Sequence, residues 1–255
     1  MTALDPAFLR LPLAHRALHD LRAGRPENSC AAIRAAVDAG YGIEIDVQVS
    51  SDGVAMVFHD DDLDRLTDAT GPVRARSAAG LGGIPLKGSD EGIPTLAEVL
   101  ALVAGRVPLL IEVKDQHGQM GPVDGVLEQA VARDLMGYSG PVAVMSFNPH
   151  SVIALRNAAP NVPRGLVSGA FRPEDCPELP ENMRARLRGI PDYAEAGACF
   201  ISHRWDDLDR PRVRDLAAAG AAILCWTIRS RQSEAAARRV AANITFEGYL
   251  PDLQP

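Results

Sequence analysis

The sequence GIEIDVQVSSDGVAMVFH, residues 42–59, decides how the rest of the chain is interpreted. It opens with a β-rich run in which Glu44 and Asp46 are two residues apart, so both side chains point to the same face of the predicted strand. An Asp-Gly pair at 52–53 predicts a turn, and a second apolar run then ends in His59. Two adjacent carboxylates are costly unless a cation or a shared proton relieves their repulsion. This hairpin therefore predicts a polar site at the end of a buried strand.

The composition is that of an ordinary globular protein. The 255 residues are 47% hydrophobic and 23% charged, with a formal net charge of −7. This acidic balance argues against nucleic acid or an anionic membrane as the main partner, and it leaves room for a small anionic substrate held by local cations. No apolar run is long enough to span a membrane, and the N-terminus does not resemble a signal peptide. We therefore expect a cytoplasmic protein without stable membrane association, with its four scattered cysteines reduced; the sequence leaves homo-oligomer formation open.

Eight short apolar runs, mostly separated by helical segments, predict parallel βα units. The expected strands are the run from 42 together with 11–15, 107–113, 141–146, 164–167, 198–202, 222–227 and 243–246. The expected helices are 30–39, 96–104, 122–135, 149–158, a region within 181–196, 211–219 and 233–242. Eight such units at this length favour a closed (β/α)₈ barrel, a single domain over 1–255. Residues 60–93 are polar and lack a sustained period, so we expect an insertion after the second strand.

In a barrel of this kind, active sites lie at the carboxyl ends of the strands. The polar residues expected there are His15, Arg16, Glu44, Asp46, His59, Glu112 and Lys114. Three carboxylates make an all-oxygen site that suits Mg²⁺ or Ca²⁺ rather than Zn²⁺. The arginine and lysine supply positive charge for a phosphate oxyanion, and two histidines suit a general acid and a general base near neutral pH. The set indicates metal-assisted phosphoester chemistry.

These residues lie in motifs that resemble the glycerophosphodiester phosphodiesterase family, among the phospholipase-C-like phosphodiesterase barrels. The motifs are AHRA (14–17), PEN (26–28), IEIDVQVSSDGVAMVFHDDDLDR (43–65), IPTLAEVL (93–100) and LIEVK (110–114), with weaker similarity at SFNP (146–149) and CWTI (225–228). The resemblance implies a (β/α)₈ barrel, a divalent cation, and hydrolysis of glycerophosphodiesters to glycerol 3-phosphate and an alcohol.

Carried over position by position, the resemblance implies a metal site and an acid/base pair. Glu44, Asp46 and Glu112 would bind the metal. His15 and His59 would be the general acid and general base, although the sequence does not say which is which.

The resemblance also implies how the substrate is held. Arg16 and Lys114 would bind the phosphate, Glu27 would line the site near the metal, and Trp226 would form an aromatic wall. The insertion at 60–93 would shape the glycerol pocket.

Two departures from the family pattern mark where this chain is expected to differ. Ala17 stands where the family usually has glycine, and a positive φ there would strain it by about 1 kcal/mol or more. Near the C-terminus, NITFEGYLPD (243–252) replaces an Asp-Gly…Thr-Asp-x-Pro pattern. We expect this second departure to affect the closing strand and the substrate preference, and to leave the metal site untouched.

The residues leave other functions open. The same set suits a lyase or a lysophospholipase-D-like enzyme acting on lipid diesters, although an aromatic content of 5% argues against an apolar groove. A catalytically silent barrel that binds metal or phosphate would be expected to lack a carboxylate or a histidine, and none is missing. A carbon–carbon lyase on a Mg²⁺ barrel would not explain the histidine pair or Arg16. The other four histidines, at 19, 117, 150 and 203, fit surface or structural roles.

Overall fold

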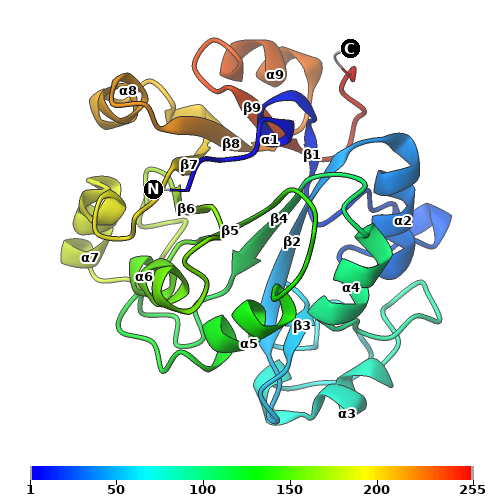
Figure 1. Cartoon of the computed structure of the whole chain (residues 1–255). Helices are drawn as coiled ribbons and strands as arrows, with labels where there is room; N and C mark the ends of the chain where they lie inside the picture. The colour runs from blue at the N-terminus through cyan, green and yellow to red at the C-terminus, as the bar shows by residue number, and fades with distance from the viewer. Residues whose placement is uncertain (1, 254–255) are drawn as a thin grey trace.

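The computed structural model describes residues 2–253, and the strands of this region close into a barrel surrounded by helices (Figure 1). Eight strands run parallel in the order β1-β9-β8-β7-β6-β5-β4-β2, and pairing of β1 with β2 closes the ring. They are β1 (Leu13–Ala14), β2 (Gly42–Val49), β4 (Leu109–Val113), β5 (Val142–Ser146), β6 (Arg164–Ser168), β7 (Phe200–Arg204), β8 (Ala222–Ile228) and β9 (Asn243–Phe246). The prediction of a (β/α)₈ barrel is confirmed.

Helices connect consecutive parallel strands and form the outer ring (Figure 1). They are α2 (Cys30–Ala39), α4 (Leu96–Val103), α5 (Val126–Asp134), α6 (Pro149–Ala158), α7 (Glu181–Arg188), α8 (Pro211–Ala218) and α9 (Arg231–Ala237). Side-chain caps start several of them: Ser29 accepts from the backbone of α2, and Thr95 and Glu98 form a reciprocal capping box on α4. Among residues 2–253, no helix is long and apolar enough to cross a membrane.

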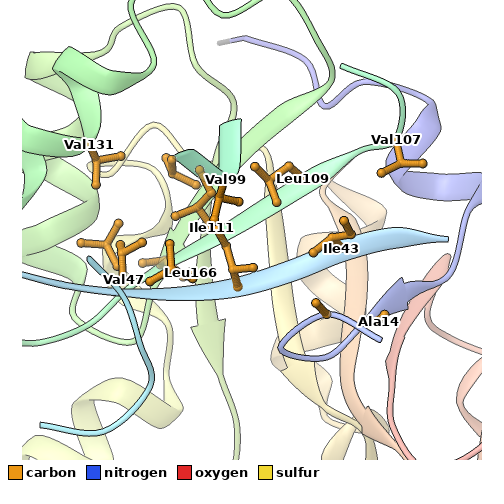
Figure 2. Packing of buried hydrophobic residues seen from close by; sticks show 14 of the residues in the cluster. Ala14, Ile43, Val47, Val99, Val107, Leu109, Ile111, Val131 and Leu166 are labelled. Atoms are coloured by element: carbon orange, nitrogen blue, oxygen red, sulfur yellow. The ribbon is translucent and has the colours of Figure 1, made fainter. Parts of the chain in front are cut away.

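The core has two layers because successive residues of each strand face opposite ways. Ile43, Ile45 and Val47 of β2 face the helices with Ile111 of β4, as Figure 2 shows for part of this cluster. A second cluster fills the barrel interior, where Phe8 of the short helix α1 (Ala7–Arg10) packs with strand residues. Alternation therefore leaves the inward positions of β2 and β4 free to carry charge near their carboxyl ends.

The segment after β3 (Ala55–Val57) is organised around its own apolar cluster. β3 pairs antiparallel with the end of β2, and the 60–93 segment, with its short helix α3 (Ala78–Gly82), packs beside it. Buried residues of this cluster include Met56, Leu63, Val73, Leu81, Leu86 and Ile93. The sequence predicts only a polar insertion here, because these apolar residues are spaced irregularly among glycines and charged residues. The segment is instead a small folded unit on the barrel.

Candidate active site

A cavity of about 300 Å³ opens at the carboxyl ends of the strands. Eight of the nine residues predicted for the site line it: His15, Arg16, Glu44, Asp46, His59, Glu112, Lys114 and Trp226. The ninth, Glu27, lies behind Arg16 and contacts that side chain rather than the cavity. The structure therefore places eight of the nine predicted residues around one cavity.

Three buried carboxylates lie close together in the cavity. Glu44 and Asp46 come from β2 and Glu112 from β4, whose register places Asp46 beside Glu112. Their side chains are nearly fully buried, and each offers a ligand oxygen within 4.8 Å of the others. Oxygens bound to one ion at about 2.0–2.6 Å can be no more than about 5 Å apart. The spacing and the all-oxygen donor set therefore fit a divalent cation such as Mg²⁺ or Ca²⁺.

The electrostatics of the two β2 carboxylates differ. Burial, together with the nearby charges of Asp46 and Glu112, raises the pKa of Glu44 well above its usual value. Burial acts on Asp46 as well, but the positive charge of Lys114, followed by those of His59 and Arg16, outweighs it and lowers the pKa of Asp46. Glu44 is thus the carboxylate in greatest need of a further cation.

The turn after β1 delivers Arg16 to the carboxylates. Arg16 and Ala17 both have left-handed backbones, with φ of 52° and 65°. The backbone N–H of Arg16 donates to Oε2 of Glu44 at 2.9 Å, and the N–H of Ala17 donates to the carbonyl of Glu44 at 3.0 Å. Since Ala17 has a positive φ, the strain expected from its replacement of glycine applies here.

Two cations face the cavity from the strands on either side of β2. Lys114 Nζ donates to Oε1 of Glu112 at 2.8 Å and lies 3.3 Å from Oδ1 of Asp46. Arg16 Nη1 donates to Oε1 of Glu27 at 2.8 Å, and its buried Nε lies 3.7 Å from Oδ2 of Asp46 without a hydrogen-bond partner in the described chain. Both side chains line the cavity and supply positive charge suited to an oxyanion.

Both predicted histidines present the same ring nitrogen to a carboxylate. Nδ1 of His15 lies 2.8 Å from Oε2 of Glu247, and Nδ1 of His59 lies 2.6 Å from Oδ1 of Asp60. A carboxylate can only accept, so Nδ1–H donates in each pair. In both residues Nε2 is left as the proton-exchanging atom at the cavity.

The insertion reaches the site through one arginine. Arg65 donates two hydrogen bonds to Asp60, at 2.6 and 2.7 Å, and two to Glu27, at 3.0 and 2.8 Å. It therefore connects the support of His59 to that of Arg16. No residue of 60–93 is among the described residues that line this cavity, and the role of the insertion in shaping the glycerol pocket stays a prediction. The segment packs on its own cluster and acts from behind the site.

The opposite side of the cavity is lined by apolar side chains and by two arginines, Arg204 of β7 and Arg229 after β8. Met145 of β5, Val167 of β6 and Trp226 of β8 line it, together with Phe147. Phe147 and Trp226 meet edge to face with ring centroids 5.5 Å apart, and Trp226 Nε1 donates to the carbonyl of Ser202 at 3.0 Å. The indole is therefore held in place, as a wall of the cavity requires.

His203 takes the structural role expected for it. It is fully buried on β7, where Nδ1 lies 2.8 Å from Oγ of Ser168 and Nε2 lies 3.3 Å from Oδ2 of Asp207. Burial lowers the pKa of His203, against the opposing charge of Asp207. These hydrogen bonds link β6, β7 and the turn after β7 within the barrel wall.

Three residues that orient the site were missed by the sequence analysis. Asn28 Nδ2 donates to Oδ2 of Asp46 at 3.0 Å from a backbone with a φ of 60°. Arg65 and Glu247 support the two histidines. The motifs PEN (26–28) and HDDDLDR (59–65) contain two of the three, whereas Glu247 lies in the segment that departs from the family pattern.

Comparisons with known proteins agree with this geometry. A family model described as "Glycerophosphoryl diester phosphodiesterase family" matches residues 15–245. The Bacillus subtilis protein YhdW is 30% identical over 82% of this chain and 84% of its own length. Glycerophosphodiester phosphodiesterase 1 of Bos taurus is 29% identical over 90% of this chain and 75% of its own length.

Solved structures share the fold. An Oleispira antarctica phosphodiesterase in complex with its product sn-glycerol-3-phosphate has a TM-score of 0.75 and 24% identity, with 92% of each chain covered. A Thermotoga maritima glycerophosphodiester phosphodiesterase has a TM-score of 0.69 and 21% identity, again with 92% of each chain covered.

Proposed function

The chain belongs to the glycerophosphoryl diester phosphodiesterase family and is a phosphodiesterase, and we propose that it hydrolyses glycerophosphodiesters to glycerol 3-phosphate and an alcohol. The observation that carries the proposal is the meeting of three buried carboxylates with two histidines, an arginine and a lysine in one cavity. Each of these groups matches a need of phosphodiester cleavage: charge neutralisation, proton transfer and phosphate binding.

Glu44, Asp46 and Glu112 would hold one divalent cation, Mg²⁺ or Ca²⁺. Their oxygens lie within 4.8 Å of one another, and the raised pKa of Glu44 reflects a cluster short of positive charge. When bound, the ion supplies positive charge to the phosphoryl oxygens. Asn28 fixes Asp46 and the N–H of Arg16 fixes Glu44, so the ligand oxygens are oriented in advance.

Arg16 and Lys114 would bind the phosphate of the substrate. The Arg16 side chain lines the cavity, and Lys114 is held among the carboxylates by Glu112 and Asp46. Glu27 would act by orienting Arg16 rather than by touching the ligands. Trp226 would pack against the organic part of the substrate.

His15 and His59 would transfer protons through Nε2. One would take the proton of the attacking oxygen, which belongs to a water molecule or to a glycerol hydroxyl of the substrate and forms a new bond to phosphorus, and the other would give a proton to the departing alkoxide. If the glycerol hydroxyl attacks, a water molecule then opens the cyclic phosphate to give glycerol 3-phosphate. Their Nδ1 atoms stay bonded to Glu247 and Asp60, so each ring keeps one orientation during the transfer. The phosphate–alcohol bond breaks, and the released oxygen gains the proton of the acid.

Release of glycerol 3-phosphate tests the proposal. Purified protein would be incubated with glycerophosphocholine or glycerophosphoethanolamine and with Mg²⁺, Ca²⁺, Mn²⁺ or EDTA. We expect cation-dependent release that is lost with EDTA. Release that persists in EDTA would overturn the metal site, and no release from either substrate with any ion would overturn this substrate class.

Three further expectations remain part of the proposal. We propose that residues 1–255 act as a single domain with the 60–93 insertion attached to the barrel. The cytoplasmic location stays a prediction. Homo-oligomer formation stays open as well.

A further inference from the structure

A carboxylate of the barrel-closing strand lies against a proposed catalytic histidine. Ala14 pairs with Phe246 where β1 meets β9, and the backbone N–H of His15 donates to the carbonyl of Phe246 at 2.9 Å. The next residues in register, His15 and Glu247, therefore lie side by side. Their Nδ1 and Oε2 atoms are 2.8 Å apart, although the residues are 232 positions apart in the sequence.

The protonation of this pair follows from its partners. The hydrogen bond with His15 lowers the pKa of Glu247 to about 2, with burial opposing and the charge of Arg229 assisting. Glu247 is thus a carboxylate at neutral pH and can only accept. Nδ1 of His15 must donate, and Nε2 is the atom left free for the cavity that His15 lines.

The carboxylate that contacts His15 is held by fewer hydrogen bonds than the carboxylate that contacts His59. Asp60 is held by two hydrogen bonds from Arg65, whereas Glu247 receives one from Arg229, at 3.2 Å, whose side chain is 62% exposed. Within residues 2–253, Glu247 is the one acceptor bonded to Nδ1 of His15. Loss of Glu247 would therefore leave the imidazole free to rotate and to change tautomer.

We propose that Glu247 is a positioning residue for His15: it holds the Nδ1–H tautomer and stabilises the imidazolium that exists while Nε2 carries a proton. The Nδ1 proton stays on the ring, and Glu247 remains unprotonated throughout. The reaction that this serves rests on the proposed function, but the tautomer does not.

The first test is spectroscopic and needs no substrate. Proton–nitrogen long-range correlation spectra identify which ring nitrogen of each histidine is protonated, and the His15→Ala variant assigns the signal. We expect the Nδ1–H tautomer for His15 in the unaltered protein and its loss in Glu247→Ala. Asp252→Asn is the matched control, because it breaks an exposed pair with Arg231 in the same C-terminal segment; it should leave the signal unchanged. An unchanged His15 signal in Glu247→Ala would overturn the proposal.

The second test measures turnover. Glu247→Gln keeps the shape of the side chain and removes its charge, and we expect kcat to fall about 100-fold with KM within about twofold. Glu247→Asp, which restores the charge on a shorter side chain, should recover part of kcat. Thermal unfolding of each variant checks that the fold is retained.

A double-mutant cycle separates positioning from a general structural effect. If Glu247 acts through His15, Glu247→Ala costs nothing further in a His15→Ala background, whereas independent losses would multiply. Multiplied losses would contradict the proposal. If the unaltered protein cleaves none of the diesters, the proposed function fails, and the spectra still decide the role of Glu247.

Discussion

The two sides of the barrel mouth differ in the kind of side chain that they contribute to the cavity. β1, β2 and β4 contribute ionisable side chains that face one another, whereas β5, β6 and β8 contribute Met145, Val167 and Trp226 to the same cavity. On the charged side, burial and like charge leave Glu44 with a raised pKa. On the apolar side, aromatic rings pack edge to face and the buried His203 is bonded within the wall. The comparison teaches that the carboxylates and histidines of the proposed mechanism come from one side, whereas the other side supplies aromatic and aliphatic surface together with the side chains of Arg204 and Arg229.

Removing one of the three buried carboxylates should cause the largest loss of turnover. Glu44→Gln keeps the size of the side chain but removes a ligand charge, and we expect turnover to fall on the order of 10³-fold. The same change relieves repulsion among three buried carboxylates, so the thermal midpoint in EDTA should not fall below that of the unaltered protein. Turnover within tenfold of the starting value would show that the reacting groups lie elsewhere.

Removing Arg65, which connects Asp60 to Glu27 behind the cavity, should lower turnover less than removing a carboxylate. Arg65→Gln removes the bonds to Asp60 and Glu27 while every cavity residue stays in place, and we expect kcat to fall about 10- to 100-fold. Arg214→Gln is the matched control, since Arg214 makes an exposed pair with Asp209 on the outer ring. Equal kcat values for the two variants would refute a role for the insertion in orienting the site.

A change on the side of the cavity formed by β5, β6 and β8 should affect KM rather than kcat. Trp226→Leu removes the aromatic wall, and we expect KM to rise about 3- to 10-fold with kcat within about twofold, because binding that is equal in ground and transition state changes KM alone. Steady-state kinetics with glycerophosphocholine would measure both constants. A loss of kcat as large as that of Arg65→Gln would erase the distinction between the two sides.

The smallest expected effect concerns the turn that carries Arg16. Ala17 has a φ of 65°, so Ala17→Gly should stabilise the protein by about 1 kcal/mol and raise the thermal midpoint by about 2–4 °C. Ala104→Gly is the matched variant, because Ala104 also has a left-handed backbone, at a φ of 48°, but ends α4 and is not among the residues that line the cavity. A lower midpoint for Ala17→Gly alone would mean that the turn depends on the methyl group.

Local spacing carried most of the prediction of this site. Glu44 and Asp46 are two residues apart, as are Glu112 and Lys114. Side chains at this spacing point to the same face of a strand, and both pairs line the cavity at the barrel mouth. The strands were predicted to within a few residues, since apolar runs bounded by turns mark buried strands. The helix expected from 122 begins at Val126, because the preceding Gly125 has a left-handed backbone.

What the sequence could not reveal depends on contacts between distant residues. Arg65 meets Glu27 across 38 positions, and His15 meets Glu247 across 232. Neither contact leaves a local pattern, because a single charged residue in a loop has the same appearance whether it is solvated or paired. The cluster of the 60–93 segment was hidden for a related reason: Leu63, Val73 and Leu81 follow no regular period.

The pairing of β1 with β9 has a consequence for synthesis of the chain. At about 5–20 residues per second, the ribosome completes the metal-ligand strands well before it reaches residue 247. Until then β1 lacks one of its two neighbours, and His15 lacks the carboxylate that orients it. The nascent polypeptide therefore carries every proposed ligand for the ion before the proposed orientation of His15 is complete, which happens when the last strand docks against the first.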